Sequence, residues 1–363
     1  VVVRGPRCPP PRRVTTQQAI DPNEKAGPSG FGAERWISNA SIPYRIYYEN
    51  LPTATAPASL VTITDDLSPD LIAGSFRLGH IQIFDRTIEI PPNRISYSTT
   101  VDLRATRGVL LEIVAGVDAS TSPPRAFWTL QSIDPATGLP PVTGDLGFLP
   151  PNDETGRGEG YVEFTIRPRT SVATGTVITN DATIIFDNNE PIRTNIVSNT
   201  IDAEAPVSAA LPLPAASDPG EVIVNIAAGD MPGGSGLAGS RLFVSRDGGA
   251  YQPVSSLSFD QQAAALLESG HVYRFVTQAT DNAGNIESLP GTPDAITTTL
   301  AIGLSPSSDT GIPGDGLTND RTPTLAFVGP PGTTIDIRLT GPREIEAVVP
   351  CGPDGRGTFT VPD

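Results

Sequence analysis

The chain has 363 residues, a formal net charge of −16 and a pI near 4.5. This acidity argues against a nucleic-acid partner, which needs a basic surface. The only cysteines are Cys8 and Cys351, which excludes a disulfide framework and a thiolate metal site. No apolar run reaches the roughly 18 residues of a membrane span, and no signal peptide is visible. The chain begins with Val rather than Met, so we expect it to be a piece of a longer protein.

Prolines (38) and glycines (36) separate short runs rich in Val, Ile, Thr, Phe and Tyr. That texture is typical of short strands joined by turns. Residues 1–20, a proline cluster with several arginines, predict a linker or the tail of a preceding module. Apolar and polar residues then alternate with period two, which predicts half-buried strands and one large β-sandwich over residues 21–203. The segments concerned are IPYRIYYEN (42–50), ISYSTTVDL (95–103), YVEFTIRP (161–168) and VITNDATIIFD (177–187).

Two further modules follow an Ala- and Pro-rich joint at residues 201–214. Residues 204–300 have the strand spacing of a fibronectin- or immunoglobulin-like sandwich, with a hairpin turn at Asp247-Gly248-Gly249. Residues 301–363 form part of another such module. The longest stretch that would tolerate a helix is Gln261 to Glu268, about two turns. The prediction is therefore an all-β fold of tandem immunoglobulin/fibronectin-like β-sandwich modules.

Several motifs resemble modules of large bacterial secreted and cell-surface proteins. A repeat domain of such proteins is similar to this chain over roughly 21–203. It matches Asp21-Pro22-Asn23-Glu24-Lys25, Ile178-x-Asn180-x-Ala182-x-Ile184-x-Phe186-Asp187 and Asn189-x-Pro191-Ile192-x-Thr194-Asn195…Asn199-Thr200-Ile201. Residue 24 is Glu where that family has Asp as often. Asp281-Asn282-Ala283-Gly284-Asn285 and the stretch 308–323 resemble bacterial Ig-like modules. The resemblance implies extracellular β-sandwich arrays, often stiffened by calcium, without catalytic activity.

Calcium is the cofactor that the acidic loops favour, because it binds carboxylate, amide and carbonyl oxygens. One glycine-rich loop contains Asp309, Asp315, Asn319 and Asp320. The alternative is a linker whose side chains cap their own backbone. Two other loops are more typical of solvated surface: Asn152, Asp153, Glu154 and Glu159 in one, and Asp187, Asn188, Asn189 and Glu190 in the other.

Lys25 is the only lysine beside 23 arginines. A desolvated lysine can act as a nucleophile, whereas arginine cannot form an amide. Surface sandwiches of Gram-positive type sometimes join a first-strand lysine to a last-strand asparagine, with a buried carboxylate as proton shuttle. Here Asn180 or Asn199 could be the partner, and Glu112 or Asp102 the shuttle. The alternative is a lysine that pairs with Asp21 or Glu24 or points at a backbone carbonyl.

No catalytic motif is present: the two histidines, His80 and His271, lie beside strand sequence and match no hydrolase or zinc template. We therefore expect a non-enzymatic extracellular stalk, fibre or adhesin scaffold that associates with itself or with neighbouring modules. Val1–Arg4 could complete the open third module of another subunit by strand addition. The alternatives are an accessory region of an exported hydrolase, and a module that binds glycan or a host surface. The second would use aromatic residues, for which the candidates are Trp36, Trp128, Tyr44, Tyr47, Tyr48 and Tyr97.

Overall fold

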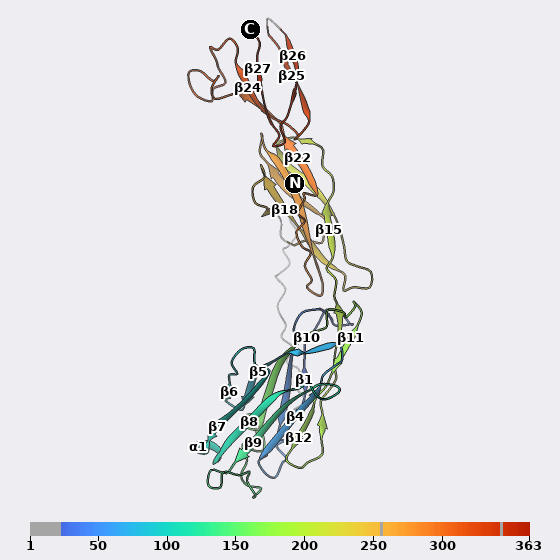
Figure 1. Ribbon diagram of the computed structural model, residues 1–363, viewed down its shortest axis with the longest axis vertical. Helices are drawn as coiled ribbons and strands as arrows, with labels where there is room; N and C mark the ends of the chain where they lie inside the picture. Colours follow the sequence, from blue (N-terminus) through green and yellow to red (C-terminus); the bar gives the residue numbers. More distant parts are fainter. Residues whose placement is uncertain (1–22, 255–256, 342–343) are drawn as a thin grey trace, which may run out of the picture. The chain divides into compact units, whose positions relative to one another are not determined.

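A computed structural model describes residues 23–254, 257–341 and 344–363 (Figure 1). These residues form 27 strands and one helix of four residues, α1 (Arg104–Arg107), so the predicted all-β fold is confirmed. Within the described ranges, no helix has the length and hydropathy to cross a membrane. The predicted linker at 1–20 and the proposed donor strand Val1–Arg4 lie outside the described residues.

The chain divides into two compact units. Unit 1 contains residues 23–28, Ser41–Arg169 and Thr179–Ser198, and unit 2 contains Ser29–Ala40, Thr170–Ile178 and Asn199–Asp363. The domain boundaries expected after residues 203 and 300 stay predictions, because both fall inside unit 2.

Unit 1 contains two antiparallel sheets. The first has the order β1-β3-β10-β5-β6, formed by β1 (Lys25–Ala26), β3 (Ile42–Glu49), β10 (Glu159–Pro168), β5 (Leu71–Ile83) and β6 (Arg86–Ile88). The second has the order β13-β12-β4-β9-β8-β7, formed by β13 (Ile192–Arg193), β12 (Thr183–Phe186), β4 (Leu60–Asp66), β9 (Arg125–Ile133), β8 (Val109–Asp118) and β7 (Ser96–Leu103).

The core of unit 1 lies between these sheets. Strand β3 buries Ile42, Tyr44, Ile46 and Tyr48 while the residues between them are more exposed, as period-two alternation requires. The ring of Trp128 on β9 lies 6.1 Å from that of Phe76 on β5 and 5.7 Å from that of Phe164 on β10. These contacts join the two sheets into a sandwich.

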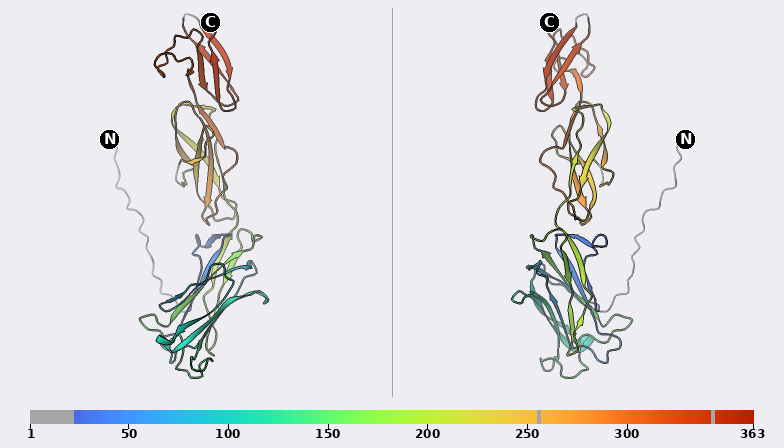
Figure 2. Two further views of the ribbon diagram at one scale, coloured as in Figure 1. Left: turned by 60° about the vertical axis from the view of Figure 1, so that its left-hand side comes forward. Right: turned by 90° about the vertical axis from the view of Figure 1, so that its right-hand side faces the viewer.

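In unit 2, residues 207–299 form two sheets around one apolar cluster (Figure 2). One sheet has the order β15-β17-β20, formed by β15 (Val207–Ala210), β17 (Gly220–Gly229) and β20 (Gln262–Leu267). The other has the order β16-β22-β21-β18-β19, formed by β16 (Ala216–Ser217), β22 (Ala295–Thr299), β21 (Val272–Asp281), β18 (Leu237–Arg246) and β19 (Gln252–Pro253). The stretch expected to tolerate a helix is strand β20.

Residues 301–360 form a smaller pair of sheets. They are β23-β24-β27 and β25-β26, formed by β23 (Ala301–Leu304), β24 (Thr324–Val328), β27 (Arg356–Thr360), β25 (Thr334–Leu339) and β26 (Ile345–Pro350). Phe327, Ile337 and the free thiol Cys351 form their core. The remaining sheet is β11-β14-β2, formed by β11 (Val177–Asn180), β14 (Val197–Asp202) and β2 (Trp36–Ser38).

Candidate functional site

Lys25 is an ionisable residue buried in the core of unit 1. Strand β1 places its backbone opposite Ile46 of β3. The side chain of Asn195 fixes that backbone: its Oδ1 accepts from the Lys25 N–H at 2.8 Å, and its Nδ2 donates to the Lys25 carbonyl at 2.9 Å. The Lys25 side chain has no exposed surface.

The partner of Lys25 is Asp65 on β4, in the opposite sheet. The Nζ of Lys25 donates to Oδ2 of Asp65, and the Asp65 side chain is also fully buried. The other oxygen, Oδ1, is buried without a hydrogen bond. The pair therefore crosses the sandwich core between β1 and β4.

Asn180, at the end of β11, completes the group. It is 3% exposed, and its amide lies beside the carboxyl of Asp65 and the hydroxyl of Tyr44. Neither Nδ2 nor Oδ1 of Asn180 makes a hydrogen bond of ordinary geometry. Buried amides are normally hydrogen-bonded, so an unsatisfied Asn180 beside a lysine needs an explanation.

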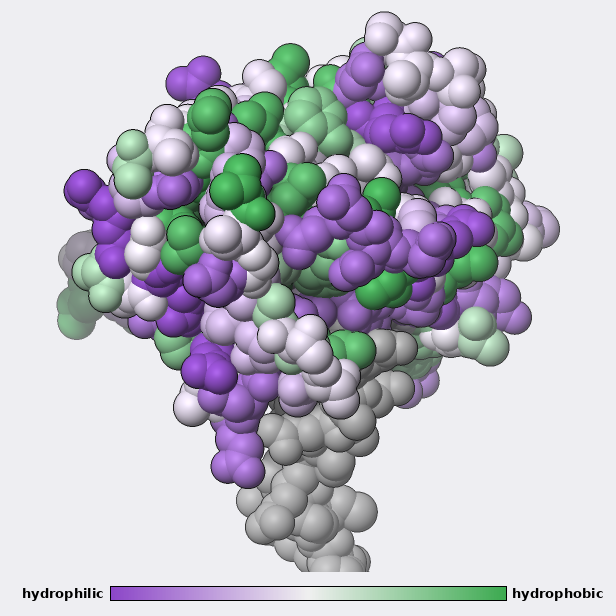
Figure 3. All heavy atoms as spheres, turned by 90° about the horizontal axis from the view of Figure 1, so that it is seen from below, coloured by the Kyte–Doolittle hydropathy of each residue, from purple (hydrophilic) through white to green (hydrophobic). Residues whose placement is uncertain are grey.

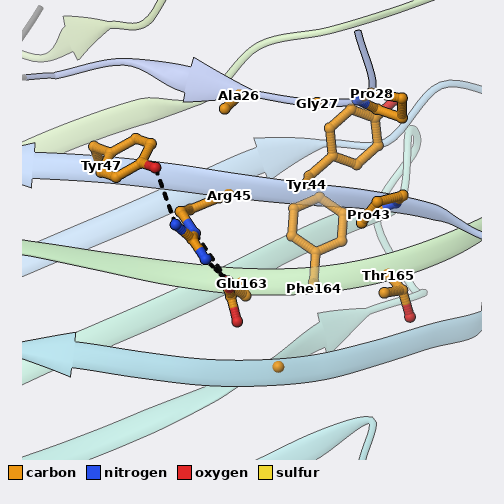
Figure 4. Close-up of a pocket in the computed structure, with 11 residues that line it drawn as sticks. Ala26, Gly27, Pro28, Pro43, Tyr44, Arg45, Tyr47, Glu163, Phe164 and Thr165 are labelled. Atoms are coloured by element: carbon orange, nitrogen blue, oxygen red, sulfur yellow. Dashed lines mark hydrogen bonds and ion pairs between the residues drawn. The ribbon is translucent and has the colours of Figure 1, made fainter. Parts of the chain in front are cut away.

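Aromatic rings cover the lysine amine. Nζ of Lys25 lies 4.7 Å from the ring centroid of Tyr44 and 5.2 Å from that of Phe164, and the two rings lie 5.2 Å apart. Figure 4 shows Tyr44 and Phe164 together in the wall of a surface hollow that Gly27 and Pro43 also line. Both rings are almost fully buried, Tyr44 at 3% and Phe164 at 1% exposure.

Burial changes the protonation of the pair. Desolvation lowers the pKa of Lys25 against the opposing charge of Asp65, and desolvation raises the pKa of Asp65. Burial likewise raises the pKa of Tyr44. Both shifts in the pair favour the neutral forms, an amine and a carboxylic acid. Lys25 can therefore pass a proton to Asp65 and become a nucleophile.

The structure corrects the expected carboxylate and, of the two expected asparagines, favours Asn180 over Asn199. Glu112 is exposed on β8, because its side chain has the opposite direction to those of the buried Leu111 and Ile113. Asp102 is also exposed and pairs with Arg104 at 2.7 Å. Asn199 donates through Nδ2 to the carbonyl of Arg35 at 3.0 Å within unit 2. The carboxylate that reaches Lys25 is Asp65, which the sequence analysis did not single out.

The loop expected to bind calcium has the geometry of capped turns. Asp315 Oδ1 accepts from the N–H of Leu317, and Asp320 Oδ1 accepts from the N–H of Thr322, both at 2.9 Å. Asp309 Oδ2 accepts from the N–H of Gly314, and the Asn319 N–H donates to Thr310. One oxygen of each of these three carboxylates caps a backbone N–H of the same loop, while Oδ1 of Asp309 is buried without a hydrogen bond.

The other two acidic loops have similar internal partners. Asn152 donates through Nδ2 to Glu49 and Glu159, which turns the amide nitrogen towards the carboxylates. Asp153 pairs with Arg157 at 3.0 Å, and Glu154 is exposed. In the third loop, Asp187 Oδ1 accepts from Ser59 and Leu60, while Asn188, Asn189 and Glu190 are exposed.

A group that sequence reasoning missed lies in unit 2. Carboxylate oxygens of Asp202, Asp230 and Asp281 lie within 4.8 Å of one another. Burial, reinforced by the charge of Asp202, raises the pKa of Asp281 against the hydrogen bonds from Asn285. Within the described part of the chain, these three could hold a hard cation such as Ca²⁺. No spacing rule could have found them, because the chain separates each from the next by many residues.

Three of the six aromatic candidates for glycan binding are core residues. Trp128, Tyr44 and Tyr48 are buried, whereas Tyr47 faces outward on the same strand, as its place in the alternation predicts. Tyr47 and Tyr161 lie 5.9 Å apart, and the Arg45 guanidinium lies 4.2 Å from the ring centroid of Tyr161. Figure 4 shows Arg45 between its hydrogen-bond partners Tyr47 and Glu163. On the face seen in Figure 3, hydrophobic and hydrophilic residues are interspersed.

Each of the two histidines lies beside a carboxylate. His80 Nδ1 lies 3.5 Å from Glu163 on an open surface, and His271 Nδ1 bonds to Asp247 at 2.7 Å beside Arg356. Both are contacts between exposed or partly exposed side chains.

Comparison with known families gives one match: residues 146–200 are similar to the family described as "Domain of unknown function (DUF7619)". Comparison with curated proteins gave no match.

Several solved structures resemble the chain in fold. Domains D2 and D3 of the major pilin SpaD from Corynebacterium diphtheriae are 14% identical, with 90% of this chain and 88% of that chain covered and a TM-score of 0.27. The C-terminal domain of the Streptococcus pyogenes antigen I/II-family protein AspA is 12% identical, with coverages of 77% and 100% and a TM-score of 0.34. The collagen-binding domain of a Staphylococcus aureus adhesin is 9% identical, with coverages of 51% and 99% and a TM-score of 0.26.

Proposed function

We propose that the chain is part of an extracellular, non-enzymatic scaffold at a bacterial cell surface, a stalk, fibre or adhesin made of tandem β-sandwich modules. The observation that carries this proposal is the enclosure of Lys25 and Asp65 between the two sheets, with no exposed side-chain surface. Enzymes place their reactive groups in clefts that substrate can enter. A reactive group that no solute can reach acts on the chain itself, which favours a mechanical role.

Labelling of intact cells tests the location. Antibodies raised against residues 23–363 should label unpermeabilised cells of the source organism, with a cytoplasmic protein as the negative control. Labelling that requires permeabilisation would contradict the proposal.

Self-association is the second part of the proposal. Light scattering on the 1–363 chain, in calcium and then in chelator, measures its molar mass. Species larger than one chain are expected, and a chain without residues 1–20 should stay monomeric if these residues donate a strand. A monomer in every buffer would leave a stalk that joins only its own neighbouring modules.

Calcium is part of the same proposal, as the ion that would stiffen unit 2. The group of Asp202, Asp230 and Asp281 places carboxylate oxygens within 4.8 Å of one another. Backbone N–H groups bond to the carboxylates of both places, so the short distances within this group are what distinguish it. The first group is therefore the better candidate. Weak extracellular sites have Kd values of about 10⁻⁴ to 10⁻³ M.

One observation favours glycan binding as a second function. Tyr47 and Tyr161 present neighbouring rings on the outer face of unit 1, and Arg45 donates to the hydroxyl of Tyr47 at 3.1 Å and to Glu163. Sugars stack on such rings and accept hydrogen bonds from such arginines. A glycan array probed with wild type and Tyr161→Ala tests this, with Tyr97→Ala on β7 as the matched control. Equal binding by all three proteins would eliminate this surface.

A further inference from the structure

We infer that Lys25 and Asn180 are joined by an intramolecular amide between Nζ and Cγ, and that Asp65 is the catalytic residue that forms it. The inference goes beyond the proposed function, because it assigns a covalent modification to unit 1 that can be measured whatever the protein does in the cell. The contacts of three buried side chains carry it.

The topology brings these residues together from distant parts of the chain. Lys25 is in the first sheet, Asp65 is in the second, and Asn180 ends the strand that precedes β12. Strand β12 pairs with β4 so that Thr183 lies opposite Thr64, which brings the segment just before β12 to the Asp65 end of β4. All three residues belong to unit 1.

The lysine has the surroundings of a nucleophile. It is enclosed by Tyr44 and Phe164, and these rings exclude the water that would otherwise stabilise an ammonium ion. Its carboxylate neighbour can take the proton that the amine must lose. Desolvation of both groups makes this transfer easier.

The position and hydrogen bonding of Asn180 are those expected of a reaction partner. Its amide lies beside the Asp65 carboxyl, yet its nitrogen and oxygen have no hydrogen bond of ordinary geometry. A permanent structural Asn would leave a buried polar group unsatisfied, which is costly. Amide formation removes Nδ2 and so relieves half of this deficit.

The chemistry balances without any other reactant. Asp65 accepts a proton from the Lys25 ammonium, and the neutral Nζ attacks Cγ of Asn180. The bond between Nζ and Cγ forms, the bond between Cγ and Nδ2 breaks, and Asp65 delivers a proton to the departing nitrogen. One molecule of ammonia leaves, and the remaining proton of the original ammonium leaves with it as ammonium or passes to solvent. The Asp65 carboxylate is regenerated.

A purely structural ion pair explains less. Burying a Lys–Asp pair costs desolvation energy that often equals its attraction, so such a pair is weak evidence for stability. It would also give no reason for an unsatisfied amide in contact with the pair. The covalent product accounts for all three side chains.

The single lysine makes the test unusually direct. The intact mass of the folded, untagged chain should be one ammonia lower than the sequence mass. After denaturation, an amine-reactive reagent should then add one label, on the α-amine, rather than two. A folded chain of full sequence mass that takes two labels would overturn the inference, whatever its variants do.

Peptide mapping locates the bond. Trypsin should not cleave after Lys25, and it should release residues 14–35 joined to residues 170–193, with the mass of the two peptides less one ammonia. A mass deficit with this pair of peptides unjoined would place the change elsewhere and would also refute the assignment.

Matched variants separate the roles. Asp65→Asn should have the full sequence mass and take two labels. Lys25→Met should also have its full sequence mass. Glu112→Gln and Asn199→Ala should form the bond as wild type does. Circular dichroism confirms which variants fold. Where Asp65→Asn fails to fold, Asn180→Leu tests the same bond from the other side. Loss of the bond in Asn199→Ala but not in Asn180→Leu would overturn the choice of Asn180.

Discussion

Gly160 on β10 shows how closely the core of unit 1 is packed at one residue. A Cβ atom added there would overlap the phenol ring of Tyr48 and the carbonyl oxygen of Gln82. Tyr48 is buried and donates its hydroxyl to that carbonyl at 3.0 Å, so the ring cannot turn away without losing the hydrogen bond. The absence of a side chain at position 160 is therefore a packing requirement.

We predict that Gly160→Ala lowers the free energy of unfolding by roughly 1–3 kcal/mol, as overpacking in a core does. Gly74→Ala is the matched control, because nothing lies within 4 Å of a Cβ at that position on β5. The control should have an effect near zero or slightly stabilising. Chemical denaturation measures the free energy of unfolding of both variants. Equal losses of stability would show that the core around Gly160 rearranges to accommodate the added methyl group.

At the scale of single residues, the sequence predicts only part of the candidate site. Lys25 and Asn180 stand out by composition and motif, but the carboxylate was wrongly expected at Glu112 or Asp102. Strand β4 did contain a signal: Asp65 shares its side-chain direction with the buried Val61 and Ile63, while Asp66 points outward. Parity within a strand predicts burial, but pairing between distant strands decides which buried groups meet.

At the scale of elements, β20 shows tertiary structure overriding propensity. Its Ala- and Leu-rich sequence suits a helix, yet Ala263, Ala265 and Leu267 alternate as buried residues, and the strand pairs with β17. The period-two alternation of the neighbouring strands was the better guide to the fold. The loops expected to bind calcium show a limit of composition. Acidic residues in a loop predict converging metal ligands and Asx turns equally well.

Strand β1 has only two residues, so its attachment to the rest of unit 1 depends strongly on the interactions of the Lys25 side chain. If Lys25 is bonded to Asn180, a loop of about 155 residues is closed in the unfolded state. The loop-closure relation used for disulfides then gives a stabilisation of about 5 kcal/mol.

We predict that Asn180→Leu loses about this free energy of unfolding in the wild-type background. In an Asp65→Asn background the same substitution should have a much smaller effect, because no bond remains to be lost. Denaturant titration of the four proteins forms a double-mutant cycle. Additive effects in that cycle would contradict a covalent link that needs both residues.

A second prediction at this scale concerns calcium in unit 2. A cation among Asp202, Asp230 and Asp281 would neutralise carboxylates that repel one another, so calcium should raise the Tm of the transition that belongs to unit 2. At about ten times Kd the stabilisation is about 1.4 kcal/mol. Thermal denaturation in calcium and in chelator measures the difference.

The same experiment, carried out on variants, distinguishes the two candidate calcium sites. Asp281→Asn should remove the response to calcium, and Asp315→Asn should leave it unchanged. The reverse pattern would place the calcium site in the loop that contains Asp315, as expected from the sequence. A wild-type Tm that calcium does not change would eliminate both candidate sites.

At the scale of the whole molecule, the covalent link gives unit 1 a property that unit 2 lacks among its described residues. Tension applied to the two ends of a chain passes through the covalent path between them. With Lys25 bonded to Asn180, that path enters at position 25 and leaves at position 180, so the residues between them bear no load. A module built this way holds its length under force, which is the behaviour required of a stalk or fibre.

We therefore predict that single-molecule pulling on the 1–363 chain releases less contour length than its sequence contains. A fully extended residue spans about 3.3–3.6 Å, so a closed loop of about 155 residues should hide roughly 500 Å. Asp65→Asn should release this length as additional unfolding, while the extension from residues 181–363 should be the same in both proteins and serves as the internal reference. Glu112→Gln should behave as wild type does. Equal total lengths for wild type and Asp65→Asn would mean that the core holds only an ion pair, and a stalk built on it would then resist force through strand pairing alone.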